Sequence, residues 1–175
     1  MDRRILFKGK SIDTGEWIEG SLITDVYYRR EDRKSIPYIL CPDKAEFDCF
    51  GDLDEFNGIY EVDEETLCQQ TGLTDKNGKP IWENDILMCH GNPDDLVKAV
   101  YEEFDVVSIE TEEIVDRAIG WHYEVVPTDA LSKMEPFCYP MPLNQQNIKQ
   151  CGMEVIGNIF DNPELLKGEK NGKNI

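Results

Sequence analysis

One stretch, residues 71–86, decides the fold of this chain: Thr71-Gly72-Leu73-Thr74-Asp75-Lys76-Asn77-Gly78-Lys79-Pro80-Ile81-Trp82-Glu83-Asn84-Asp85-Ile86. Its segment 75–78 is typical of a tight hairpin turn, because Asn and Gly tolerate the positive φ that a type I′ turn or a G1 bulge requires. An Asp at the first turn position accepts a hydrogen bond from the backbone two residues further on. The apolar residues on both sides therefore predict two short strands joined by a tip that carries lysines.

The second half of this stretch predicts a further turn and a buried strand. Pro80 has no N–H to give to a ladder, so its strand is expected at a sheet edge or only after the proline. Residues 83–85 form a polar turn, and the apolar run 86–89 follows as a strand. The carboxylates Asp75, Glu83 and Asp85 could serve acid–base chemistry or bind a metal, but turn residues cluster for local reasons, and we interpret them as turn and cap residues.

Many short alternating segments with frequent turn signals predict a mainly β protein, without the alternation of strands and helices that a parallel sheet requires. We expect two small all-β parts: a twisted antiparallel sheet in residues 1–70 and a small SH3-like barrel in residues 71–161. A short capped helix that begins at Pro163 and a polar tail complete the chain in residues 162–175. Few other short helices are expected.

Several finer predictions follow from composition along the chain. Residues 36–41 predict an edge strand because they contain Pro37. Strands are also expected over 96–104, 105–110 and 118–126, with 111–117 ambiguous between helix and strand. A short helix is expected over 130–134, and the polar segment 144–150 is expected to be a loop.

The charge of the chain excludes some partners. Its 18 basic and 36 acidic residues give a net charge of −18, which opposes direct binding to nucleic-acid phosphates and to anionic membranes. The acidic residues are dispersed along the sequence, which favours a solvated surface. The alternative is a surface that imitates the charge of a nucleic acid and occupies the basic groove of a host enzyme.

The six cysteines show no spacing typical of a zinc site. The N-terminus does not resemble a signal peptide, and no apolar run approaches the ~20 residues of a membrane span. We therefore expect a cytoplasmic protein of a bacterial host with reduced, mostly buried thiols.

No residue pattern indicates catalysis or a cofactor. His90 follows Cys89, and neighbouring strand side chains point to opposite faces, so the two would not easily share a metal. If the Trp121 face of its strand is the core, His122 faces outward. Ser108 and Cys89 lack a nucleophile motif, and there is no glycine-rich phosphate loop. We expect no catalytic residue, no cofactor and no metal, and hence no enzyme; a carboxylate-based hydrolase stays open because acidic residues are numerous.

Two long blocks carry a family resemblance. Residues 62–86, with E-E-T-L-C-Q-Q-T-G-L-T-D-K-N-G-K-P-I-W-E-N-D-I over 64–86, and residues 154–166, E-V-I-G-N-I-F-D-N-P-E-L-L, resemble the signature of the YopX family of phage and prophage proteins. Residues 5–10 and 15–20 also look typical of its start. Asn84 departs from the family's usual Gly, but Asn is also comfortable at positive φ. The resemblance implies a mainly β protein of uncharacterised function that can assemble into a ring-like oligomer.

These observations predict a non-enzymatic accessory protein, encoded by a phage or prophage, that acts through protein contacts or self-assembly. We expect a homo-oligomer, with a host or phage protein as a further candidate partner. The candidate contact residues are those of the exposed tip: Lys76, Asn77, Gly78 and Lys79. The alternatives are the acidic inhibitor of a host enzyme and the hydrolase.

Overall fold

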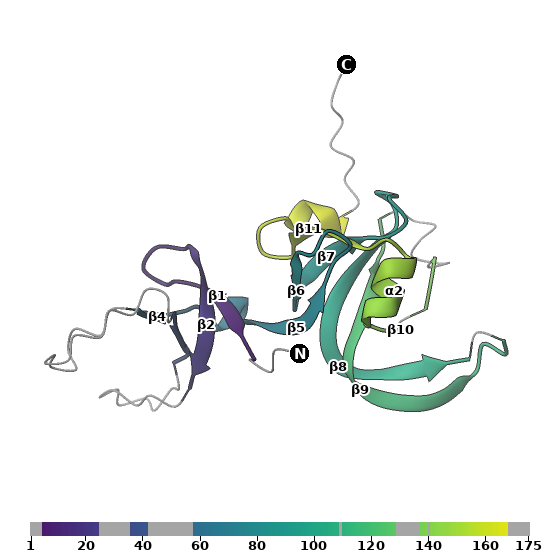
Figure 1. Cartoon of the computed structure of the whole chain (residues 1–175), viewed down its shortest axis with the longest axis horizontal. Coiled ribbons are helices and arrows are strands. Elements are labelled where there is room, and N and C mark those ends of the chain that lie inside the picture. The colour runs from purple at the N-terminus through teal and green to yellow at the C-terminus, as the bar shows by residue number, and fades with distance from the viewer. Residues whose placement is uncertain are drawn as a thin grey trace, which may run out of the picture. The chain divides into compact units, whose positions relative to one another are not determined.

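The structure is a computed structural model that describes residues 5–24, 36–41, 58–108, 110–128, 137–139 and 141–167. The chain divides into two compact units, Met1–Gln70 (unit 1) and Thr71–Ile175 (unit 2). The strands form two antiparallel sheets, so the predicted mainly β class is confirmed (Figure 1). No helix within the described ranges is long and apolar enough to cross a membrane. The helix expected over 130–134 lies outside the described residues.

Unit 1 is an antiparallel meander with a small apolar core. Its strands, in chain order, are β1 (Phe7–Lys10), β2 (Trp17–Ile23), β3 (Tyr38–Leu40) and β4 (Ile59–Glu61), and the short 3₁₀ helix η2 (Glu64–Thr66) leads into β5 (Cys68–Thr74). They lie in the order β4-β3-β2-β1-β5. Ile18, Ile39 and Val62 form the buried core. Gly20 allows β2 to approach β3 closely, since a Cβ there would lie 2.0 Å from the Leu40 carbonyl oxygen.

The expected edge position of residues 36–41 is wrong, because β3 lies between β2 and β4. Pro37 precedes the strand, and its carbonyl accepts a hydrogen bond from the N–H of Val62 at 3.1 Å. The ladder begins only at Tyr38, so the N–H that proline lacks interrupts no pairing.

Strand β5 crosses the boundary between the units. Its first two residues pair with β1, and its second half neighbours β6 (Pro80–Trp82) in unit 2. The Thr71 hydroxyl links the second half of β5 to β6. It donates a hydrogen bond to the Ile81 carbonyl at 2.8 Å and accepts one from the N–H of Leu73 at 3.1 Å. β6 ends the strand order, so Pro80 lies in an edge strand as predicted.

Unit 2 contains the second sheet. Its strands are β7 (Asp85–Met88), β8 (Leu96–Val107), β9 (Ile114–Val126), β10 (Met141–Pro142) and β11 (Glu154–Asn158), followed by the 3₁₀ helix η3 (Pro163–Lys167). This last helix begins at Pro163 as predicted. The strand order β10-β9-β8-β7-β11 has two ends. The described strands thus form an open sheet, and the SH3-like barrel is not confirmed.

Strands β8 and β9 form one long hairpin rather than several separate strands. They pair continuously from Leu96 with Val126 to Val107 with Ile114, with one register shift next to Val107. The segment 111–117, ambiguous in sequence, is the turn and the start of β9. We call residues 101–107 and 114–120 the β8–β9 arm. Within the described ranges, no third strand pairs with the arm (Figure 1).

The segment 144–150 corrects a prediction: it contains the helix α2 (Gln145–Gln150) instead of a loop. The Asn144 carboxamide caps it by accepting hydrogen bonds from the N–H groups of Gln146 and Asn147. Only Ile148 of the helix is buried, and it lies fully within the core of unit 2. A six-residue helix with one apolar anchor is too short for a periodic pattern to reveal it.

Both faces of the sheet of unit 2 are covered at β7, at the start of β8 and at the end of β9. Register places Leu87 beside Val97, and these belong to the main core with Ile81, Cys89, Ala99, Tyr123, Leu143, Ile148, Met153 and Val155. The opposite face holds Ile86, Leu96 and Val126, against which Met88, Ile159 and Leu165 pack. Burial on both faces makes this part of the sheet rigid, and the arm extends from it.

Candidate functional site

The predicted tip is anchored by one buried carboxylate. Asp75 is 4% exposed, and its Oδ1 accepts from the N–H groups of Asn77 at 2.8 Å and Lys79 at 2.9 Å. Its Oδ2 accepts from the N–H of Val155 in β11 at 3.1 Å. The interpretation of Asp75 as a turn residue is confirmed, and the same side chain also ties the hairpin to a strand 80 residues away.

The tip residues proposed as a contact surface lie at the surface of unit 2. Lys76, Asn77, Gly78 and Lys79 are all exposed, and Gly78 has φ 86°. The Lys76 ammonium pairs with Glu154 of β11 at 2.6 Å. One of the two lysine charges of the tip is therefore paired within the chain.

The turn at residues 83–85 is also structural. Asn84 has φ 64°, so it adopts the positive φ expected of it. The buried carboxylate of Asp85 accepts from the N–H of Trp82 at 2.9 Å. Among the described residues, the one group with three converging potential metal ligands lies elsewhere, so Asp75, Glu83 and Asp85 do not form a shared site.

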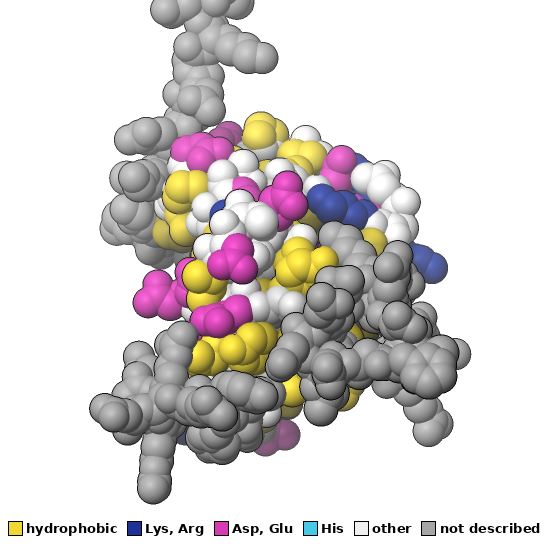
Figure 2. Space-filling model, turned by 90° about the vertical axis from the view of Figure 1, so that its left-hand side faces the viewer, with side chains coloured by type: hydrophobic (Ala, Val, Ile, Leu, Met, Phe, Trp, Pro, Cys, Tyr) yellow, Lys and Arg dark blue, Asp and Glu magenta, His cyan; other side chains and the backbone are white. Residues whose placement is uncertain are grey.

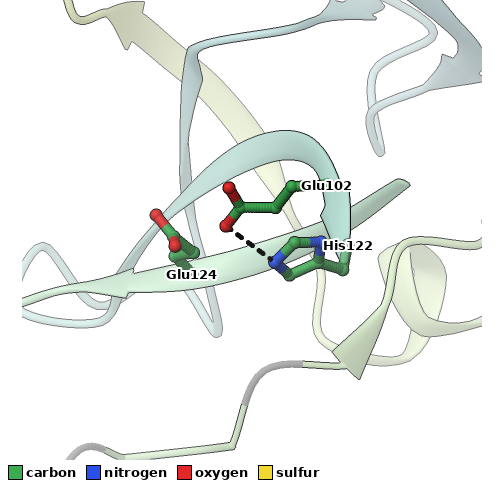
Figure 3. Close-up of side chains that lie close together, drawn as sticks. All are labelled: Glu102, His122 and Glu124. Atoms are coloured by element: carbon green, nitrogen blue, oxygen red, sulfur yellow. Dashed lines mark ion pairs between the residues drawn. The ribbon is translucent and has the colours of Figure 1, made fainter. Parts of the chain in front are cut away.

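That group consists of Glu102, His122 and Glu124, which come from the paired strands β8 and β9 (Figure 3). Val100 pairs with His122 and Glu102 with Gly120, so Glu102 lies diagonally across from the imidazole. Glu124 follows His122 by two residues and shares its face of the strand. One ligand atom from each side chain lies within 4.8 Å of the other two.

His122 is buried, with 2% of its surface exposed. Its ring stacks on Phe104 with centroids 4.4 Å apart. Its Nδ1 lies 3.4 Å from the Gly120 carbonyl, and its Nε2 lies 3.8 Å from Oε1 of Glu102. The sequence-based expectation put His122 on the face opposite Trp121, and the strand alternation agrees. The outward exposure that this suggested is wrong, because Phe104 covers the ring.

Negative side chains outnumber positive ones around Glu102, His122 and Glu124. Burial raises the pKa of Glu124, but the hydrogen bond and the positive charge of Lys98, followed by a hydrogen bond with Glu102 and attraction to His122, outweigh it, so the pKa of Glu124 lies below its ordinary value. The Lys98 ammonium lies 3.0 Å from Oε2 of Glu124. The three groups border an open hollow of about 340 Å³, lined also by Glu103, Phe104, Asp105, Val107 and Ile114. Carboxylates outnumber cations there, so the hollow favours a positively charged occupant.

Sequence reasoning missed this group because Glu102 lies 20 residues before His122 and 22 before Glu124. The available signal was the pair of alternating segments Glu102-x-Phe104 and His122-x-Glu124. This signal becomes informative only when the strand register is known, and no local sequence pattern specifies the register.

The second histidine lies apart from this group. His90 has φ 56° and is half exposed. Its Nδ1 lies 3.2 Å from Oδ2 of Asp95, and its N–H donates to the Cys151 carbonyl at 2.7 Å. These contacts stabilise the loop between β7 and β8.

Cysteines in the described ranges are free thiols: Cys41, Cys68, Cys89, Cys138 and Cys151. Burial, followed by the neighbouring Cys151, Cys138 and Asp95, raises the pKa of the Cys89 thiol from 9.0 to about 12. Burial likewise raises the pKa of Cys138 to about 11.

We expect the free energy of unfolding to fall as pH rises from about 9 towards about 12. In this window the folded protein holds the Cys89 proton while the unfolded chain has lost it, so raising the pH favours unfolding. Denaturant titrations at a series of pH values measure the slope. Cys89→Ala should make the slope shallower, and an identical slope in the variant would show that this thiol does not contribute.

The comparisons with known proteins identify a family. Residues 27–167 match the family model described as YopX protein, which is most of the 175 residues. The chain is also similar to a solved structure, the crystal structure of protein EF1440 from Enterococcus faecalis, at 20% identity and a TM-score of 0.45, covering 95% of this chain and 100% of that chain. No curated protein matches it. The chain belongs to the YopX family.

Proposed function

We propose that this protein is a non-enzymatic binding protein whose β8–β9 arm contacts a partner protein with a basic surface. The observation that carries the proposal is that no third strand among the described residues pairs with the arm. A two-stranded ribbon by itself is marginally stable in water. Within the described ranges, the arm pairs only with itself, so its outer edges present backbone groups on which another chain can pair.

Apolar side chains on the arm support a protein partner. Tyr101, Ile114, Val115 and Ile119 are between 52% and 72% exposed. Tyr101 also packs edge-on against Trp121, with ring centroids 5.1 Å apart, so it is held in place. A concentration of exposed apolar side chains bordered by charge is typical of an interaction surface.

Charge favours a basic partner over a second copy of this chain. Between residues 101 and 120 the sequence holds the carboxylates Glu102, Glu103, Asp105, Glu110, Glu112, Glu113 and Asp116. The single basic residue of that segment, Arg117, is 2.9 Å from Asp105. Two such arms would repel each other, whereas lysine or arginine side chains around an apolar patch would complement one. The homo-oligomer expected from sequence is therefore the less favoured assembly.

One face of the molecule shows how charge is distributed away from a concentrated patch. On the face drawn in Figure 2, carboxylate side chains lie at separate places among hydrophobic and neutral ones. Scattered charge of this kind keeps a surface solvated. We therefore place the contact on the arm, with the tip residues Lys76–Lys79 as a second contact to be tested in the same experiment, and we look for the partner among bacterial host or phage proteins of the cytoplasm.

The test captures partners on the immobilised full-length chain from a bacterial lysate, identifies them by mass spectrometry and remeasures binding with the purified partner. We expect a basic protein whose binding weakens with salt and is lost in Ile119→Ser. The matched control is Ile12→Ser, which removes an isoleucine of unit 1 that is 57% exposed, against 72% for Ile119. Equal binding by the two variants would refute the arm as the contact, and a loss in Lys76→Ala with Lys79→Ala would move it to the tip.

Two further readouts separate the alternatives. Competition by DNA for the captured partner would identify the protein as an acidic inhibitor that occupies a nucleic-acid groove. Sedimentation equilibrium that shows a salt-independent oligomer in the absence of any partner would favour self-assembly.

A second candidate function, a carboxylate-based hydrolase, is favoured by one observation: Glu102, Glu103, Asp105 and Glu124 line the same hollow. The test is turnover of p-nitrophenyl ester and phosphodiester substrates. Activity that disappears in Glu102→Gln would support hydrolysis, and equal background rates in both proteins would argue against it.

A further inference from the structure

The side chains of Glu102, His122 and Glu124 turn potential metal ligands toward one another. A carbonyl oxygen can only accept, so the contact of Nδ1 with Gly120 at 3.4 Å requires the proton on Nδ1. On the other side of the ring, Nε2 lies toward the Glu102 carboxylate, and the dashed line in Figure 3 joins these two atoms. Both atoms are potential ligands of a cation, and they face each other across a short distance.

The separation of these atoms indicates what that charge is. At 3.8 Å, Nε2 and Oε1 of Glu102 are too far apart for a direct hydrogen bond. A metal ion at about 2.1 Å from each of two ligands holds them up to about 4.2 Å apart, and 3.8 Å falls within this range. The spacing therefore accommodates a metal ion between the two atoms.

The surroundings of His122 are those of a positioned ligand. A histidine that ligates a metal commonly donates its other ring N–H to a carbonyl or carboxylate, which fixes the tautomer and the ring orientation. Here the Gly120 carbonyl has that place, and the stacked Phe104 ring restricts rotation. The two carboxylates are more exposed than the imidazole, so they can adjust to an ion while His122 stays fixed.

The charge balance also favours a cation. The Lys98 ammonium pairs with Glu124 through Oε2 of that carboxylate. Glu102 and Glu103 at the hollow keep the neighbourhood negative, while Asp105 is paired with Arg117. A divalent ion would gain from this field, and the open hollow leaves room for water in its remaining positions.

We propose that Glu102, His122 and Glu124 bind one divalent transition-metal ion, with Oε1 of Glu102, Nε2 of His122 and a carboxylate oxygen of Glu124 as ligands. A set of two carboxylates and one imidazole accepts ions such as Zn²⁺ and Mn²⁺. This site is distinct from the partner contact. It lies on the strand face opposite to that of Tyr101 and Ile119, and its metal binding is measured without a partner.

The experiment titrates the full-length protein with Zn²⁺ by isothermal titration calorimetry and with Co²⁺ by absorption spectroscopy. We expect one bound ion and at least a ~10-fold weaker affinity in Glu102→Gln and in Glu124→Gln, since loss of an outer-shell partner alone costs that much. Glu103→Gln is the matched control: it makes the same charge change in the same hollow, outside the ligand set. Its affinity should stay close to that of the native protein.

Two measurements keep the test decisive if a variant at the buried His122 fails to fold. Lys98→Met removes the cation that competes for Glu124 and should tighten Zn²⁺ binding. In the native protein, Co²⁺ should broaden the ring resonances of His122 and leave those of His90, the other histidine, unchanged. Absence of binding, equal loss in Glu102→Gln and Glu103→Gln, or an intense thiolate-to-cobalt band that places the ion at the cysteines would each overturn the proposal.

Discussion

Asp75→Ala is expected to lower the free energy of unfolding of unit 2 by about 4.5 kcal/mol, because three hydrogen bonds to a charged group are lost and each contributes at least about 1.5 kcal/mol. The substitution leaves three backbone N–H groups, those of Asn77, Lys79 and Val155, without their acceptor. The bond to Val155 is buried and joins segments 80 residues apart. Its loss frees the hairpin tip from β11. Denaturant titration followed by circular dichroism measures the change.

Two variants show whether the effect belongs to the acceptor. Asp75→Asn keeps one oxygen and should recover part of the stability, since the two N–H groups at Oδ1 can still be satisfied. Asp94→Ala removes an exposed carboxylate from the same unit and should change the stability by less than about 0.5 kcal/mol. If Asp75→Ala behaves like Asp94→Ala, the buried carboxylate does not anchor the tip.

Gly20→Ala is expected to disrupt unit 1. An added Cβ would lie 2.0 Å from the Leu40 carbonyl oxygen and 2.8 Å from its carbon, and backbone atoms cannot move aside as a flexible side chain can. Strand β3 must then separate from β2, at a loss of about 3 kcal/mol, the upper part of the range for overpacking. Hydrogen exchange followed by mass spectrometry measures the loss of protection in β2 and β3.

Gly120→Ala is the matched control for this prediction. It makes the same chemical change within a strand, but no heavy atom beyond its chain neighbours lies within 4 Å of the added Cβ. The stability should change by no more than about 1 kcal/mol, in the stabilising direction, because the unfolded chain becomes less flexible. Unchanged protection of β2 and β3 in Gly20→Ala would contradict the close approach of the two strands.

Sequence alone sufficed where the controlling interactions are local. The turn at Asp75–Gly78, the positive φ of Asn84, the edge position of Pro80 and the helix start at Pro163 all follow from backbone preferences and from acceptors within a few residues. The mainly β class followed in the same way, because turn signals and alternation recur throughout the chain. A helix as short as α2 was missed, since its formation depends on the Asn144 cap and on burial of Ile148 rather than on a repeating pattern.

The candidate site depended on tertiary structure. Alternation correctly placed His122 opposite Trp121, but burial of its ring comes from Phe104 on the neighbouring strand. That neighbour is specified by the pairing of Val100 with His122, and a shift of one residue would turn the carboxylates to the other face. Register is a collective property of the hairpin and of the core that holds its base. The sequence therefore determined where the strands and turns lie, while only the tertiary structure decided which charges meet.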